Sequence, residues 1–235
     1  MNTHTRLQKA ASPRARDSLA NTLEMDIIFG RLPPRERLIE DELMARFAKS
    51  RHYVRSAIDT VVQHGLAVRE INKGAYVCDF THDDVIALYQ LRNILHEAAL
   101  SLIIFPVEPQ IIARLEALNT AHVAAVARSD LQDVFHLNNL FHAAVFLCCP
   151  NRALADAIDV HAHRMYPIGT NSFHREGYLM QAQQEHRQII DALVRGDIAA
   201  LISLHERHIA RPVNDYLEKH GMKGFPPVPN RAYLP

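Results

Sequence analysis

Apolar residues repeat at helical spacing near the beginning of the chain. Leu19, Leu23 and Ile27 lie four positions apart, which places them on one face and predicts a helix over about residues 15–29. A glycine and a pair of prolines follow this stretch. They end the helix and impose an extended connection.

Two shorter helices are predicted next, over about residues 40–48 and 51–64, with a turn between them. Ser50 stands directly before the second helix, where its hydroxyl can cap backbone N–H groups. Gly65 follows that helix and ends it. Because so few residues join the two helices, they form a helix-turn-helix pair.

Two short β-prone stretches come after these helices, over about residues 66–71 and 75–78. They flank the turn residues Asn72-Lys73-Gly74, so the three pieces predict a β-hairpin, the wing. This order of elements is that of a winged helix-turn-helix. In such a domain the helix after the turn enters the major groove of DNA.

Beyond residue 80 the hydrophobic pattern is helical, with no convincing strand pattern. The expected helices cover about residues 82–104, 107–128, 130–148, 151–166, 177–195 and 197–219. Asp130 and Asp197 stand where N-caps are expected. We therefore expect a mainly α protein, with an N-terminal winged helix-turn-helix followed by an all-helical antiparallel bundle of six to seven helices.

The chain is expected to divide into four segments. These are a flexible N-terminal tail over 1–12, the winged helix-turn-helix DNA-binding domain over 13–80, an all-α ligand-binding domain over 81–220, and a proline-rich C-terminal tail over 221–235. The last segment holds four prolines and little apolar periodicity, which predicts an extended tail.

The overall composition is that of a globular protein. Of the 235 residues 48% are hydrophobic, which excludes wholesale disorder. No apolar run approaches the roughly 20 residues that span a bilayer, and residues 1–12 lack a signal-peptide core. The three cysteines form no CxxC pair. We therefore expect a cytoplasmic protein without a membrane partner.

Charge is distributed unevenly although the formal net charge is zero. Residues 1–80 hold 13 Lys and Arg against 10 Asp and Glu, a net charge of +3, and residues 81–235 hold 13 against 16, a net charge of −3. The stretch 46–55 carries four cations and no acid. Such a run is commonly a solvated helix face, but here it includes the start of the predicted recognition helix. Zero net charge therefore does not argue against binding to DNA.

The DNA-binding segment resembles that of the GntR superfamily of transcriptional regulators. The superfamily signature Ser-Arg-Thr-Pro-Val-Arg-Glu-Ala-Leu reads SRHYVRSAI over residues 50–58, and the wing reads KGAYV over 73–77. Over about residues 14–219 the chain looks like the FadR-like branch, whose effector-binding domain is called FCD. Thr-Pro and Glu of the signature are replaced here. Such changes alter the operator sequence more than the fold, since base contacts specify and phosphate contacts position.

The candidate DNA contacts lie on the recognition helix and the wing. Arg51 and Arg55 are four residues apart and share one helix face. A guanidinium there can bind guanine O6 and N7 through two N–H groups, or it can clamp a phosphate. The resemblance implies that DNA is contacted by Ser50, Arg51, His52, Arg55 and Gly74. By position, Tyr53 flanks the arginines near the start of the helix, and Lys73 approaches the DNA backbone from the wing, so both are candidate contacts as well. Tyr53 could instead pack against the wing, and we expect Arg46 to be simply solvated.

Three of the fifteen histidines stand out by position: His142, His186 and His208. Each lies on the apolar stripe of a predicted helix, where a lone histidine is most often a core residue. Three of them on neighbouring helices weaken that explanation. His186 lies ten residues before Gly196 and His208 twelve after it, so in an antiparallel hairpin they sit roughly 15 and 18 Å from the turn. His205 fits this register equally well.

The resemblance implies a metal site built on these histidines. The family's ligands are an aspartate and a histidine four residues apart and two further histidines; the matching positions are Asn138, His142, His186 and His208. Asn138 thus replaces the aspartate, and a neutral amide oxygen is a weaker ligand than a carboxylate. Three imidazoles and one amide could still hold a divalent metal ion, zinc or nickel. The alternative is a metal-free pocket in which the same groups donate hydrogen bonds.

The first helix of the second domain carries the candidate effector-binding residues, Arg92 and His96. By resemblance, Arg92 corresponds to a family arginine that can pair with the carboxylate of an effector. His96 replaces the family's glutamate, which indicates a specialised pocket. A surface salt bridge is the alternative role for Arg92.

Two functional hypotheses follow from these patterns. In the first, the protein is no enzyme but a transcriptional regulator, a repressor, that binds a pseudo-palindromic operator in double-stranded DNA as a homodimer and responds to a small organic acid. In the second, it is a helical metalloenzyme acting on a small carboxylate. The stretch HERH over 205–208 is one residue short of the H-E-x-x-H motif, which favours the regulator. A metal-stabilised domain without an effector is a third possibility.

Overall fold

The computed structural model describes residues 18–224 of the chain. The predicted tail over 1–12, the first positions of the helix predicted over 15–29, and residues 225–235 of the predicted proline-rich tail lie outside the described residues. The described chain divides into two compact units. The first contains the described residues up to Asp79 together with the short stretch His163–Pro167, and the second contains the other described residues from Phe80 onward.

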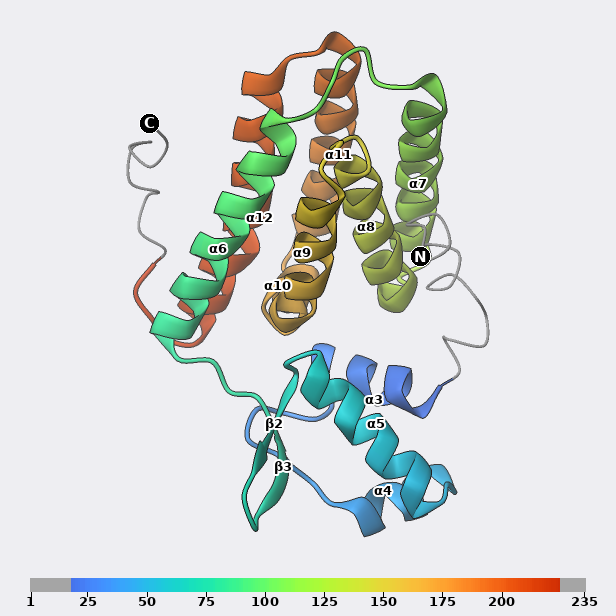
Figure 1. The fold of residues 1–235 in the computed structure, drawn as a ribbon, viewed down its shortest axis with the longest axis vertical. Helices are drawn as coiled ribbons and strands as arrows, with labels where there is room; N and C mark the ends of the chain where they lie inside the picture. The colour runs from blue at the N-terminus through green and yellow to red at the C-terminus, as the bar shows by residue number, and fades with distance from the viewer. Residues whose placement is uncertain (1–17, 225–235) are drawn as a thin grey trace. The chain divides into compact units, whose positions relative to one another are not determined.

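The first unit is a winged helix-turn-helix (Figure 1). Its elements are α3 (Leu19–Ile28), β1 (Arg37–Leu38), α4 (Glu40–Phe47), α5 (Arg51–Gln63), β2 (Ala67–Glu70) and β3 (Gly74–Val77). The apolar stripe of α3 packs on α5, and Leu23, Ile27, Val54 and Ile58 are buried between or beside these helices. The predicted element order is therefore confirmed.

The wing belongs to a three-stranded antiparallel sheet in the order β1-β3-β2. Tyr76 of β3 pairs with Arg37 of β1 on one side and with Val68 of β2 on the other. The hydrophobic pattern does not predict β1, because a strand of two residues shows no alternation. Gly74, at the turn of the wing, has a φ of 101°, a conformation that favours glycine.

The predicted helix caps differ in outcome. Asp130 and Asp197 each accept a hydrogen bond from the backbone N–H three residues on, at 3.0 and 2.9 Å, so both predicted caps are confirmed. Ser50 occupies the N-cap position of α5, but its hydroxyl accepts no hydrogen bond from the helix. The predicted side-chain cap is therefore wrong, and the exposed hydroxyl is left at the surface of the unit.

The second unit is an all-helical bundle (Figure 1). Its helices are α6 (His82–Ser101), α7 (Pro109–Ala127), α8 (Leu131–Phe146), α9 (Arg152–Ala162), α10 (Tyr166–Thr170), α11 (Tyr178–Arg195) and α12 (Ile198–Lys219), with 3₁₀ turns at His163–Met165 and Asn171–His174. The helix predicted over 151–166 ends earlier, at Ala162. Pro167 stands in the first turn of α10, where a missing backbone N–H is tolerated.

Helix α11 occupies a central place in the bundle, because it packs against both α7 and α12. Its partner α12 also packs on α6, and α7 packs on α8 (Figure 1). Gly196 joins α11 to α12 with a φ of 69°, and a Cβ there would lie 3.5 Å from the Phe105 ring. This tight turn sets the antiparallel register of α11 and α12 and thereby decides which of their side chains face each other.

Candidate functional site

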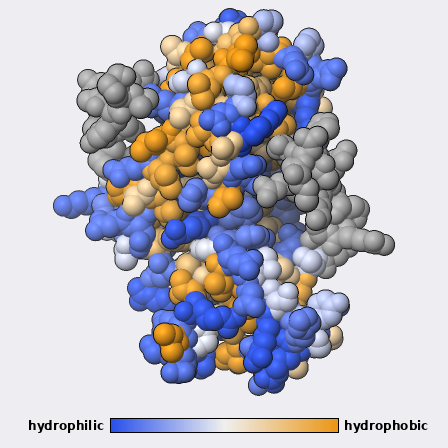
Figure 2. Space-filling view, viewed as in Figure 1, coloured by the Kyte–Doolittle hydropathy of each residue, from blue (hydrophilic) through white to orange (hydrophobic). Residues whose placement is uncertain are grey.

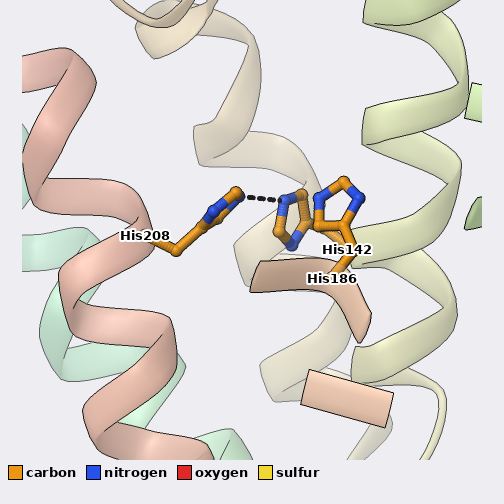
Figure 3. Close-up of side chains that lie close together, drawn as sticks. All are labelled: His142, His186 and His208. Atoms are coloured by element: carbon orange, nitrogen blue, oxygen red, sulfur yellow. Dashed lines mark hydrogen bonds between the residues drawn. The ribbon is translucent and has the colours of Figure 1, made fainter. Parts of the chain in front are cut away.

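Three histidines from three helices come together inside the bundle: His142 of α8, His186 of α11 and His208 of α12 (Figure 3). One ring nitrogen from each lies within 4.8 Å of the others. The residues are 8%, 0% and 6% exposed. The fold therefore gathers the three histidines that the sequence singles out into one buried cluster, the histidine triad.

The apolar stripes that build the bundle also place these rings. Phe141 precedes His142 in the chain, and the ring of His186 stacks on the Phe141 ring with the centroids 4.1 Å apart. The turn at Gly196 brings the rings of His186 and His208 to within 5.2 Å. Packing of α8, α11 and α12 thus delivers the three imidazoles to one point.

Glu185 and Arg211 form an outer layer around the triad. His208 Nδ1 lies 2.6 Å from Glu185 Oε2, and Arg211 donates from Nη2 to Oε1 of the same carboxylate. Burial alone would raise the pKa of Glu185, but the hydrogen bond from His208 and the charges of His208 and Arg211 outweigh it and hold that pKa below its usual value. The carboxylate is therefore ionised. His208 Nδ1 donates to this carboxylate, so His208 Nε2 is the nitrogen turned toward the other two histidines.

Several nitrogens of the triad lack the hydrogen-bond partners that buried groups normally have. His208 Nε2 faces His142 Nε2 at 3.1 Å. Within residues 18–224, His142 Nδ1 and both ring nitrogens of His186 are buried without a hydrogen-bond partner. Each unmade bond costs about 1–3 kcal/mol. A divalent cation would use lone pairs that the fold leaves unpaired, so the donor set fits a metal such as zinc or nickel.

The protonation state of the cluster also suits metal binding. Burial lowers the pKa of His142 and His186 well below the ordinary value of 6.5, and the neighbouring His208 adds to the effect. The buried His122 of α7, whose ring lies 5.2 Å from that of His186, has its pKa lowered by burial to about 4. Imidazoles bind metals in the neutral form, which is the form these pKa values favour near pH 7.

A second pair of buried histidines adjoins the triad. His205 Nε2 lies 2.8 Å from His96 Nδ1, and the His205 ring is 5.4 Å from the ring of His142. Burial lowers the pKa of His96 and His205 well below 6.5. His205, which fitted the helix register as well as His208, therefore bonds to the predicted effector residue His96 and does not belong to the triad.

Arg92 of α6 lies close to this second pair. Its guanidinium carbon is 5.6 Å from the centroid of the Tyr89 ring, and its Nε is buried without a hydrogen-bond partner among the described residues. Burial is the main cause that lowers the pKa of His96 and His205, and the positive charge of Arg92 lowers both further. Arg92 forms no ion pair within residues 18–224, and its role in binding an effector is still a prediction.

The sequence did not predict that Glu185 and His122 lie beside the histidine triad. Asn138, by contrast, was predicted as a metal ligand. Glu185 points from a different face of α11 than His186, and that face meets His208 of α12; only the register of the α11–α12 turn could have indicated this. His122 appeared only as one histidine among fifteen. Asn138 lies one helical turn before His142 on α8 and is half-buried, and its role as a ligand is still a prediction.

The candidate DNA contacts lie on the surface of the first unit. Ser50, His52 and Arg51 are exposed at the start of α5. Tyr53 is 63% exposed, so the alternative that it packs against the wing is wrong. Arg51 and Arg55 are more than half exposed but form ion pairs with acidic residues of α4.

The wing and Arg46 complete this surface. Lys73 donates from Nζ to Glu70 Oε2 at 2.8 Å, beside Gly74 at the turn. Arg46 is not simply solvated, as the charge run suggested. Its Nη2 lies 2.5 Å from a carboxylate oxygen of buried Asp26, which also binds Arg31 at 2.5 Å. Asp26 comes from α3, so tertiary packing brings its carboxylate to Arg46, and a charge run does not reveal such packing.

No helix within residues 18–224 combines the length and the apolar character needed to cross a membrane.

Comparison with known proteins identifies both units. Residues 15–77 match the family model "Bacterial regulatory proteins, gntR family", and residues 87–211 match the FCD domain. The HTH-type transcriptional regulator YdhC of Bacillus subtilis (strain 168) is 24% identical over 208 residues, which is 85% of this chain and 91% of that protein. An HTH-type transcriptional regulator of Agrobacterium vitis, from the TAR-I ttuE-ttuC' intergenic region, is 29% identical over 119 residues, 49% of this chain and 70% of that protein.

Solved structures share the fold. The chain is similar to E. coli McbR/YncC with a TM-score of 0.71 at 20% identity, over 86% of this chain and 96% of that one. It is also similar to Lar, which controls expression of the Listeria monocytogenes agr system, with a TM-score of 0.61 at 22% identity over 85% and 94% of the two chains. These matches give the metalloenzyme hypothesis no support. The chain belongs to the GntR family of bacterial regulatory proteins and carries an FCD domain, so it is a transcriptional regulator and not an enzyme.

Proposed function

We propose that this regulator is a repressor whose affinity for a pseudo-palindromic operator is controlled by a small carboxylate bound in the FCD domain. The observation that carries the proposal is the buried histidine triad, close to a second histidine pair and Arg92. Three of the six ring nitrogens of the triad lack a hydrogen-bond partner within residues 18–224. A ligand that binds one state of the protein more tightly shifts the equilibrium toward that state.

The metal ion of this proposal is zinc or nickel, held by His142, His186 and His208, with Asn138 as a fourth ligand. When bound, the ion supplies a positive charge and open positions that can accept a carboxylate oxygen. Arg92, whose buried Nε has no hydrogen-bond partner within residues 18–224, would receive the carboxylate of the effector, and His96 would shape the pocket through its bond to His205.

The DNA-binding part of the proposal concerns α5 and the wing. Ser50, Arg51, His52, Tyr53 and Arg55 would contact DNA from the recognition helix, and Lys73 and Gly74 from the wing. All of these residues except Gly74 have exposed side chains at the surface of the first unit. The protein would act in the cytoplasm, where a bacterial regulator meets its DNA.

We propose that the protein works as a homodimer, which would place two recognition helices on the two halves of the operator. The bundle exposes large apolar side chains, including Ile94, Ile104 and Val160 at 66%, 70% and 62%. Figure 2 shows apolar areas on this unit beside hydrophilic ones. Apolar surface of this kind favours association, which sedimentation analysis of the purified protein would measure.

A thermal-shift screen tests the effector hypothesis. Small carboxylates are added to protein of measured metal content, and each hit is repeated with Arg92→Ala. A stabilising acid whose effect disappears in this variant, and which changes binding to the protein's own promoter DNA, supports the proposal. If no acid stabilises the metal-loaded protein, the domain is metal-stabilised without an effector. If the promoter DNA binds no better than random duplex, control of an operator fails.

A further inference from the structure

Both arginines of the recognition helix contact acidic side chains from the first turn of α4. Arg51 donates from Nη2 to Asp41 Oδ1 at 2.6 Å, and its Nη1 lies 3.6 Å from Glu40 Oε2. Arg55 donates from Nε to both carboxylate oxygens of Glu40, at 2.8 and 2.9 Å. The two acids come from the helix that precedes the recognition helix, so they reach the arginines through the fold of the helix-turn-helix.

The two contacts use different parts of the guanidinium group. Arg55 engages Glu40 through Nε, and its two terminal nitrogens make no other hydrogen bond within residues 18–224. Those terminal nitrogens are a pair that can bind guanine O6 and N7 together. Arg51 turns both terminal nitrogens toward carboxylates. Glu40 thus orients Arg55 and leaves its two terminal nitrogens available to a base, whereas Asp41 binds a terminal nitrogen of Arg51.

The surroundings of the two acids also differ. The Glu40 side chain is 23% exposed and the Asp41 side chain 74%. Glu40 is therefore held by its packing and restrains Arg55 in turn. Asp41 lies in water, where an ion pair is weak and Arg51 can exchange it for DNA. An exposed carboxylate at this place also repels phosphates, and that repulsion acts on DNA of any sequence.

We propose that Glu40 and Asp41 have different roles in DNA recognition. Glu40 is a positioning residue that restricts Arg55 to a base edge and so raises sequence preference. Asp41 restrains Arg51 and limits affinity for DNA irrespective of sequence, which keeps occupancy of non-operator DNA low. The inference rests on the proposed DNA contacts of Arg51 and Arg55, and it adds specific roles for two residues that carry the wrong charge to bind DNA themselves.

The test compares two duplexes with the full chain: one selected by the wild-type protein from a random-sequence pool, and one of random sequence. Asp41→Asn should tighten binding to both by a similar factor, about three- to fivefold, and should steepen the salt dependence by about one unit of slope. Glu42→Gln is the matched control, because Glu42 is the exposed neighbour, carries the same charge and makes no ion pair in the described part of the chain. Equal effects of the Asp41 and Glu42 changes overturn the role of Asp41.

Glu40→Gln should weaken binding to the selected duplex about tenfold and leave binding to the random duplex unchanged or tighter. A new selection with this variant should lose preference at one base position. Glu40→Asp keeps the charge at the start of α4 but shortens the reach to Arg55, so it separates positioning from helix stability. An unchanged ratio of the two affinities in both variants overturns the role of Glu40.

Removing the arginines distinguishes failure of this inference from failure of the proposed contacts. Arg51→Ala should weaken binding, and adding Asp41→Asn to it should then restore no more affinity than Glu42→Gln does. If Arg51→Ala binds the selected duplex like the wild type, the proposed contact itself is wrong. If Arg51→Ala weakens binding but Asp41→Asn matches Glu42→Gln, only the restraint by Asp41 is wrong.

Discussion

The Nε2 atoms of His142 and His208 face each other at 3.1 Å, although 66 residues separate the two histidines in the chain. The hydrogen bond between His208 Nδ1 and Glu185 holds the His208 ring in this orientation. Two facing imidazole nitrogens can share one hydrogen, or both can donate lone pairs to one cation. This arrangement therefore predicts a metal ion at the triad, and the metal content of the purified protein tests it.

Replacing His186 with alanine should remove the metal. Its ring nitrogens are buried without a hydrogen-bond partner within residues 18–224, and loss of one of three imidazoles should lower the metal content of the purified protein to less than about a tenth. Elemental analysis by mass spectrometry measures this content. His174→Ala removes an exposed histidine and should have no effect. Full metal content in the His186 variant would show that the triad is not the site.

Glu185→Gln should weaken metal binding about 10- to 100-fold, because the neutral amide no longer strengthens the His208 imidazole as a ligand. Competition with a chromophoric chelator measures the dissociation constant. Glu176→Gln changes the same charge at an exposed position and serves as the control. If both variants bind metal as the wild type does, the bond between Glu185 and His208 is purely structural.

The metal-free protein should lose stability as the pH falls below 6.5, partly through His122. Burial lowers the pKa of His122 to about 4, so between pH 6.5 and about 4 the unfolded chain binds more protons there than the folded protein. The free energy of unfolding then decreases as the pH falls. His122→Leu should reduce the difference between about pH 7 and about pH 4.5 by about 2 to 3 kcal/mol. Urea unfolding at the two pH values measures it, with His174→Leu as control, and an equal pH dependence in all three proteins would contradict the prediction.

Ser50→Ala should leave stability nearly unchanged, because the Ser50 hydroxyl accepts no hydrogen bond from α5. Ser18→Ala should lower the free energy of unfolding by about 1 kcal/mol, since Ser18 Oγ accepts a hydrogen bond from the Asn21 N–H at 3.1 Å. Chemical denaturation compares the two variants. If Ser50 contacts DNA as proposed, its replacement should weaken DNA binding without loss of stability. A large loss of stability in the Ser50 variant would mean that it caps α5 after all.

Local patterns in the sequence were sufficient for most of the secondary structure. Helical periodicity and the positions of caps and breakers predicted α6 to α8, α11 and α12 within a few residues, because these signals lie within a few positions of each other. The two-residue strand β1 carries no such signal and was missed. Helix α9 ends at Ala162, four residues before the end of the predicted helix, and Pro167 farther on has no backbone N–H to donate to the preceding turn.

The candidate site shows where local reasoning stops. Residue type and helical spacing singled out His142, His186 and His208, but spacing left His205 as an equal choice. Only the packing of α6 against α12 decided that His205 bonds to His96, and only the register of α11 and α12 joined His208 to Glu185. Likewise Arg46 binds Asp26, 20 residues away. The sequence by itself determines which faces are apolar and which residues can donate; the partner of each buried polar group depends on contacts between distant segments, which exist only once the helices have packed.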